Sequence, residues 1–179
     1  MKESKTKDIV YIGIFAALIA ACSWITIPGP VPFTMQTFAV FLTVGLLGGR
    51  RGTLAVLVYI LLGAVGLPVF SNFQGGIGAL MGTTGGYIMG FLASALLMWA
   101  MEKLPGNKRL VLLGSMLLGL LACYLFGTVW FRMVYLRTTG PVGWMSVLGW
   151  CVFPFIIPDC IKILLAMLLT DRLKKHVNA

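Results

Sequence analysis

Two ionisable residues, Asp159 and Lys162, stand inside an apolar segment with the sequence IIPDCIKILLAMLL. Charged side chains are costly in such a segment, face the protein interior, and are candidates for a functional role. Their spacing of three residues places both on one face of a helix, within reach of each other or of one ligand. A solute with N–H donors and a carboxylate would use both: Asp159 would accept from the donors and Lys162 would pair with the anion.

The alternative for these two residues is a purely structural ion pair. A buried pair of charges contributes little net stability, often less than apolar replacements would, which disfavours that alternative. Pro158 precedes the pair, and proline suits the first turn of a helix, where its missing N–H costs nothing. We therefore expect a broken helix whose inner part begins at Pro158, with Asp159 in its first turn facing a solute site.

A second group of candidate residues surrounds the uncharged stretch GLPVFSNFQGGIGALMGTTGG. Non-helical backbone near membrane depth is tolerated where it is buried in protein or lines a cavity, so this stretch predicts a lid or a pocket wall. It brings Asn72 and Gln74 as candidate ligand contacts beside aromatic residues, a mixture that suits a small amphiphilic ligand. Tyr87 follows as a ligand contact or an interfacial anchor, whereas Gly86 and Gly90 have the spacing of close helix packing.

The elements that position these residues are predicted to be membrane-spanning helices in an all-α protein. Hydrophobic residues make up 59% of the 179 residues and charged residues only 11%, against about a quarter charged in soluble domains. Period-two alternation is absent, so a barrel is not indicated. We predict a single domain, 1–179, with six spans. Their approximate ranges are 9–27, 33–49, 54–69, 85–101, 110–131 and 146–169.

The basic residues of this chain indicate its orientation rather than a nucleic-acid partner. The net charge is +9, but the basic residues form short clusters between apolar runs, with no basic face. The main clusters lie at 2–7, 50–51, 103–109 and 172–175, which six spans place on the same side. The positive-inside rule then predicts that both termini are cytoplasmic.

The sequence lacks the residues that several kinds of chemistry require. The four cysteines fall in apolar runs without a CxxC pair, and the only histidine, His176, lies in the basic tail. We therefore predict no metal site and no cofactor. The sequence contains no GxxxxGK[ST] phosphate-binding loop, and Asp159 is the only acidic residue inside a span. The chain can hold a solute, but it shows no means of driving transport.

Four alanines in the first span form two pairs with four-residue spacing, Ala16 with Ala20 and Ala17 with Ala21. Small residues at this spacing allow another helix to approach closely. Because energy must come from elsewhere, we expect these four alanines to dock a partner helix. The spacing alone does not tell a partner helix from an internal one.

Five segments of this chain resemble the biotin-specific substrate-binding (S) component of energy-coupling factor (ECF) transporters, which are bacterial vitamin importers. They are AALIAA in the first span, VPFTMQTF at 31–38, GLPVF at 66–70, GTTGGYIMGF at 82–91 and FPFIIPDCIK at 153–162. The resemblance covers nearly the whole chain, and the combination of TGGY with PDxxK is its most specific part.

The resemblance implies a six-helix protein of the bacterial cell membrane that binds biotin from outside. It implies that Asp159, Lys162 and Tyr87 contact the ligand. It also implies an energising module, made of a transmembrane coupling protein and two ATP-binding cassette ATPases, that docks on the alanines of the first helix.

Three other functions remain as alternatives to a biotin carrier. The chain could be an S component for another vitamin, which only ligand binding separates. It could be a membrane-embedded lipid-modifying enzyme with Asp159 as base, although no set of nucleophile, base and orienting group is visible. A structural or assembly subunit would have no pocket and would tolerate Asp159→Asn.

Overall fold

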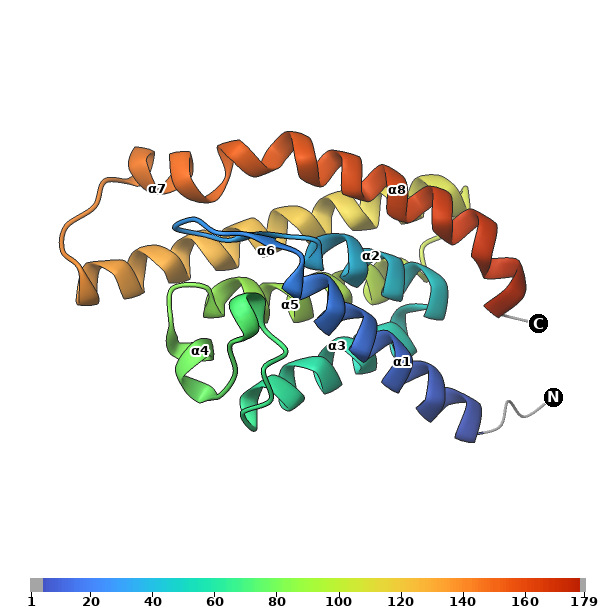
Figure 1. The fold of residues 1–179 in the computed structure, drawn as a ribbon. Coiled ribbons are helices and arrows are strands. Elements are labelled where there is room, and N and C mark those ends of the chain that lie inside the picture. Colours follow the sequence, from blue (N-terminus) through green and yellow to red (C-terminus); the bar gives the residue numbers. More distant parts are fainter. Residues whose placement is uncertain (1–4, 178–179) are drawn as a thin grey trace.

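The computed structural model describes residues 5–177, with side chains described as far as Lys174. Helices dominate this part of the chain, and the long helices α6 and α8 run lengthwise beside each other (Figure 1). The elements in chain order are α1 (Lys5–Trp24), β1 (Thr26–Ile27), β2 (Phe33–Thr34), α2 (Gln36–Leu47), α3 (Gly49–Ala64), the 3-10 helix η1 (Ser71–Phe73), α4 (Ile77–Met81), α5 (Gly85–Met101), α6 (Lys108–Thr138), α7 (Trp144–Cys151) and α8 (Phe153–Val177).

Three helical stretches are long and apolar enough to cross a membrane: Lys5–Trp24, Lys108–Thr138 and Trp144–Lys174. Helices α2 and α5 are apolar but shorter. At 1.5 Å per residue, the 12 residues of α2 extend about 18 Å, less than the roughly 30 Å of a bilayer core. The helical architecture is as predicted, while α2 is shorter than the predicted span 33–49.

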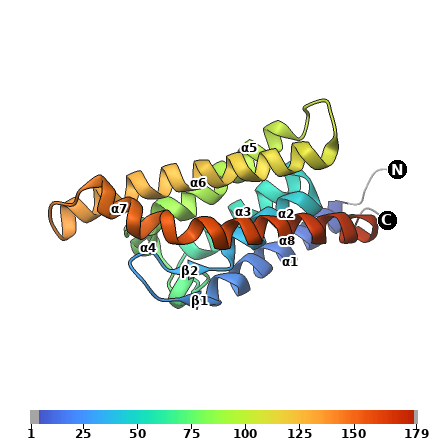
Figure 2. The same cartoon turned by 90° about the horizontal axis from the view of Figure 1, so that it is seen from above.

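The connection between α1 and α2 contains a structure that the all-α prediction missed. Strands β1 and β2 pair antiparallel, with Thr26 opposite Thr34 and Ile27 opposite Phe33. The sequence PGPVP lies between them, and residues that precede proline favour extended backbone. Figure 2 shows this ribbon near α4, away from the end of the molecule that carries both termini.

Helices α5 and α6 approach closely because glycine leaves room at their contact. A Cβ atom on Gly86 would collide with the Cβ of Trp130, and one on Gly90 would lie 3.1 Å from the Cα of Cys123. The ring of Tyr87 in turn occupies the space beside Gly127, where a Cβ atom would overlap it. The packing role predicted for Gly86 and Gly90 is confirmed.

The start of α1 and the end of α8 lie at the same end of the molecule (Figure 1). Among the described residues, ion pairs join helices there, Arg51 with Asp8 at 2.9 Å and Arg109 with Asp171 at 3.1 Å. Lys2, part of the first predicted basic cluster, lies outside the described residues.

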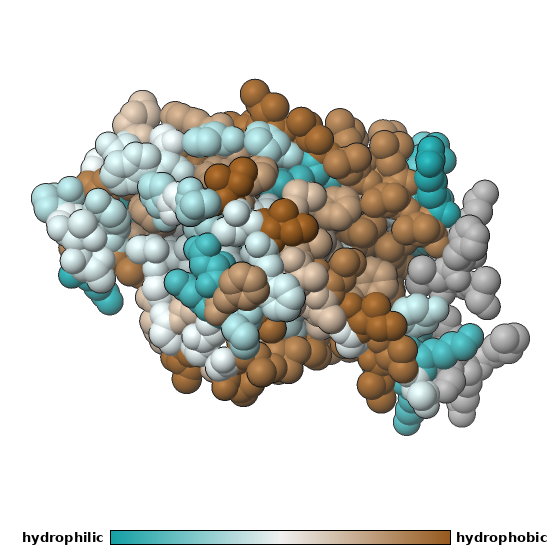
Figure 3. Space-filling view, in the orientation of Figure 1, coloured by the Kyte–Doolittle hydropathy of each residue, from teal (hydrophilic) through white to brown (hydrophobic). Residues whose placement is uncertain are grey.

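Large apolar side chains are exposed along α6 and α8, among them Leu121, Leu125 and Ile157. Figure 3 shows broad hydrophobic areas between hydrophilic regions near the two ends of the molecule. A soluble monomer rarely exposes continuous apolar patches of this kind. This surface is that of a membrane protein.

Candidate ligand-binding site

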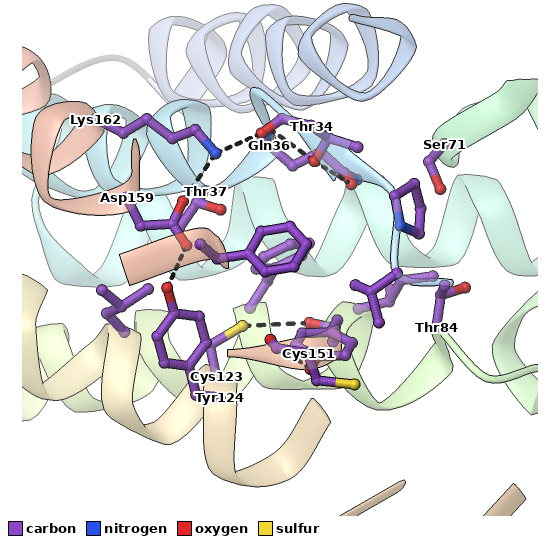
Figure 4. Close-up of a pocket in the computed structure, with 17 residues that line it drawn as sticks. Thr34, Gln36, Thr37, Ser71, Thr84, Cys123, Tyr124, Cys151, Asp159 and Lys162 are labelled. Atoms are coloured by element: carbon purple, nitrogen blue, oxygen red, sulfur yellow. Dashed lines mark hydrogen bonds and ion pairs between the residues drawn. The ribbon is translucent and has the colours of Figure 1, made fainter. Parts of the chain in front are cut away.

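A cavity lies where α2, α5, α6 and α8 meet the ribbon and the loop that carries η1 (Figure 4). Apolar side chains such as Val31, Ile88 and Phe155 form much of its wall. The polar or charged residues that line it are Thr34, Gln36, Thr37, Ser71, Thr84, Tyr87, Tyr124, Asp159 and Lys162. Ser71 and Thr84 belong to the uncharged stretch that was predicted to form a lid or a pocket wall, and both line this cavity.

The predicted pair of charges lies together at one end of this cavity. Lys162 Nζ donates to Asp159 Oδ1 at 2.8 Å and to the Thr34 carbonyl oxygen at 2.7 Å. The same ammonium lies 4.0 Å from the centre of the Phe33 ring, where a cation is attracted by the ring electrons. Asp159 and Lys162 are only 2% and 4% exposed. The Lys162 ammonium therefore already has hydrogen-bond acceptors and a counter-ion within the protein, without a ligand.

Tyr124 completes this end of the cavity and was not predicted from the sequence as a site residue. Its hydroxyl donates to Asp159 Oδ2 at 2.6 Å, so each carboxylate oxygen accepts one hydrogen bond. A carboxylate has about four acceptor sites, which leaves Asp159 able to accept from a ligand as well. The available signal was a phenol placed in the middle of the apolar run 110–131.

The predicted break in the last span lies in a different place. Helix α7 ends at Cys151, Val152 leaves helical geometry (φ −128°, ψ −59°), and α8 begins at Phe153. Pro154 therefore falls in the first turn, where proline fits, while Pro158 lies inside α8. The prediction that Asp159 occupies the first turn was wrong, because a second proline four residues earlier occupies that turn.

A chain of buried hydrogen bonds extends from the charged pair into α3. The Thr34 hydroxyl donates to Gln36 Oε1 at 3.1 Å, and Gln36 Nε2 donates to the Tyr59 hydroxyl at 2.5 Å. Since the Thr34 carbonyl accepts from Lys162, the ribbon, α2, α3 and α8 share one polar network. Such a network holds the end of the cavity in a single arrangement.

The remaining predicted ligand contacts divide into two groups. Tyr87 lines the cavity, and its hydroxyl donates to the Cys151 carbonyl at 3.2 Å. Asn72 and Gln74 are exposed and line a neighbouring, open hollow instead. The structure thus brings Tyr87 to the same cavity as Asp159 and Lys162, but not Asn72 and Gln74.

The four alanines of α1 do not share one surface. Ala16 and Ala20 are 1% and 6% exposed and belong to the core, whereas Ala17 and Ala21 are exposed. Successive residues of a helix point about 100° apart, so two pairs offset by one residue face different neighbours. The prediction that Ala16 and Ala20 belong to an outward docking face is therefore corrected. Both alanines are buried against other helices of this chain.

Known proteins match this chain along its whole length. The model of the BioY family matches residues 1–179. A protein of Thermotoga maritima named biotin transporter BioY is 42% identical over 171 residues, covering 94% of this chain and 96% of its own. A probable biotin transporter BioY of Pyrococcus horikoshii is 36% identical, covering 95% and 98%.

A solved structure is similar in fold. The crystal structure of the S-component for biotin from an ECF-type ABC transporter has a TM-score of 0.84 and 28% identity to this chain. The match covers 98% of this chain and 94% of that one. With the family model and the relatives above, this likeness shows that the chain belongs to the BioY family.

Proposed function

We propose that this protein is the biotin-binding membrane subunit of a vitamin uptake transporter. The observation that carries the proposal is the cavity with Asp159, Lys162 and Tyr124 at one end, in a chain of the BioY family. A carboxylate next to N–H and O–H donors suits the ureido ring of biotin, which presents two N–H donors and one carbonyl. The matched relatives are named transporters, so the function is transport rather than catalysis.

We further propose that the chain is one domain, residues 1–179, that crosses the bacterial cell membrane six times, with both termini in the cytoplasm. The shared end of α1 and α8 and the basic clusters near it support this orientation. The cavity then opens toward the outside through the ribbon and the loop 65–84. Shorter helices such as α2 complete a span together with the ribbon beside them.

The first expected result is that the isolated chain in detergent binds biotin at one site. Calorimetric titration with biotin, thiamine and riboflavin tests this, because each vitamin presents a different polar pattern to the same cavity. Heat from biotin alone supports the assignment. Heat from another vitamin alone would reassign the ligand, and binding of none would remove the carrier function.

Energy for uptake must come from partners, which we propose to be a transmembrane coupling protein and two ATP-binding cassette ATPases. The exposed residues Ala17 and Ala21 support a narrower docking surface on α1 than the four alanines together. Gly13 extends this line by one turn, and a Cβ atom there would meet nothing within 4 Å. Small residues in this pattern let another helix approach closely in lipid.

Ala17→Trp is expected to leave biotin binding intact while abolishing co-purification with the coupling protein and ATP-dependent uptake. The indole would fill the space that a docking helix needs. Leu121→Trp, at an exposed position on α6, is the matched control and should leave both properties unchanged. Ala16→Trp should instead overpack the core, costing roughly 1–3 kcal/mol. Normal uptake by Ala17→Trp would contradict the docking surface.

A further inference from the structure

A second hollow lies at the end of the molecule where α1 begins, between the first turns of α1 and α3 and the end of α5 (Figure 1). We call it the terminal hollow. It is open to the surface, and it shares no lining residue with the cavity described above. The apolar side chains that line it are Ile9, Ile12, Leu47, Leu54 and Trp99. The charged side chains that line it are Lys5, Asp8, Arg50, Arg51 and Glu102.

The terminal hollow holds three cations and two anions, and both anions already have partners within the protein. Asp8 pairs with Arg51 at 2.9 Å. Glu102 Oε2 accepts a backbone N–H at the start of α3 at 2.7 Å. Lys5 and Arg50 are exposed and form no ion pair with any residue that the structure describes. These two cations are therefore open to an anion from outside the chain.

Polarity changes along α1 and α3 in the same direction. Lys5 lies one turn before Ile9 on α1, and Arg50 lies one turn before Leu54 on α3. Residues four apart share a helix face, and one turn advances about 5.4 Å along the axis. Ile9 is 70% exposed and Leu54 38% exposed. Each helix thus presents a basic group at the end of the molecule and an exposed apolar group beneath it, which is the order of head group and acyl chain in a phospholipid.

Trp99 gives this hollow a fixed wall. Its ring lies so close to Gly49 that a Cβ atom there would overlap it. Tryptophan is enriched where a membrane meets water, because its ring is amphipathic. The wall of the terminal hollow therefore has the side chain that is typical of the level of lipid head groups.

We propose that the terminal hollow binds one anionic phospholipid, with its phosphate at Lys5 and Arg50 and the first part of an acyl chain against Ile9 and Leu54. Basic pockets between helices at the membrane surface attract anionic head groups. A guanidinium also donates hydrogen bonds to phosphate oxygens with favourable geometry. The cations above the apolar side chains favour a lipid over an apolar partner helix. This site is independent of the biotin assignment, because it lies outside the cavity.

Native mass spectrometry of the detergent-purified chain, offered equal amounts of phosphatidylglycerol and phosphatidylcholine, measures lipid preference. The wild type should retain one phosphatidylglycerol with a preference of roughly 10- to 30-fold, since each basic residue near a head group contributes about fivefold in affinity. A Lys5→Gln, Arg50→Gln double variant should lower this preference to about threefold or less. Arg172→Gln with Lys174→Gln is the matched control, because it removes the same charge from exposed positions of α8 outside the terminal hollow. The control should keep the wild-type preference.

Fluorescence of Trp99 tests whether the lipid lies in the terminal hollow. Phosphatidylglycerol with bromine on an acyl chain, close to the glycerol, should quench Trp99 emission more than the same brominated phosphatidylcholine does. The difference between the wild type and Trp99→Phe isolates this emission from that of the other tryptophans. In the Lys5→Gln, Arg50→Gln variant, the two lipids should quench Trp99 equally.

Two results would overturn the lipid site directly. One is equal quenching of Trp99 by both lipids in the wild type. The other is loss of the preference in the α8 control as large as in the Lys5→Gln, Arg50→Gln variant, because general surface charge would then account for it. A third contradicting result would assign the terminal hollow to a protein partner: no lipid preference in the isolated chain, with Trp99 protected from both brominated lipids once the coupling protein is bound.

Discussion

A double variant, Asp159→Leu with Lys162→Met, is expected to fold about as well as the wild type and to bind biotin at least about 100-fold more weakly. Replacing a buried ion pair by apolar residues of similar size is often neutral or stabilising. The ligand, however, would lose two charge-assisted hydrogen bonds, each contributing roughly 1.5–3 kcal/mol, or together about 10²- to 10⁴-fold in affinity. Calorimetric titration and thermal unfolding in detergent measure the two properties.

Single variants supply the control for this prediction. Asp159→Asn leaves the Lys162 ammonium without its counter-ion in a site that is 4% exposed, and breaking such a pair costs roughly 3–5 kcal/mol of stability. The single variant should therefore be less stable than the double variant, although both bind weakly. A double variant with wild-type affinity would show that the pair is structural only.

The pairing of Asp159 with Lys162 could be predicted from sequence because it depends on local geometry alone. Two charges three residues apart in an apolar helix have one common face, and a helix in lipid turns that face inward. The glycine spacing of Gly86 and Gly90 was informative for the same reason: a four-residue repeat forms a flat helix surface whatever its partner is.

Features that depend on the partner element could not be predicted in this way. Both alanine pairs of α1 have the same spacing, and only the position of the neighbouring helices makes one pair internal and the other exposed. Tyr124 was missed because its role comes from contact with a helix 35 residues away. The break at Val152 was misplaced because Pro154 and Pro158 are equally suitable for a first turn by type.

The contact between α5 and α6 carries the second large expected effect. Gly86→Leu should lower stability by at least about 3 kcal/mol, near or beyond the upper end of the usual cost of overpacking. A Cβ atom alone would collide with the Cβ of Trp130 and lie 2.9 Å from the Phe126 carbonyl oxygen. Neither group is the free end of a flexible side chain, so the two helices must separate. Thermal unfolding in detergent should show a melting temperature lower by roughly 10 °C.

Separation of these helices should also remove biotin binding, because α5 carries Tyr87 and Ile88 into the cavity and α6 carries Tyr124. Gly114→Leu is the matched control: Gly114 also lies in a long apolar helix, but a Cβ atom there would meet nothing within 4 Å. Leucine is the better helix former by up to about 1 kcal/mol, so Gly114→Leu should be neutral or slightly stabilising and should bind biotin normally. Equal behaviour of the two variants would mean that the close approach at Gly86 does not hold the cavity together. A different outcome is a Gly86→Leu protein that melts at a lower temperature and still binds biotin with unchanged affinity. That result would show that the hydrogen-bond network of Asp159, Lys162 and Gln36, rather than the contact at Gly86, keeps the cavity in its shape.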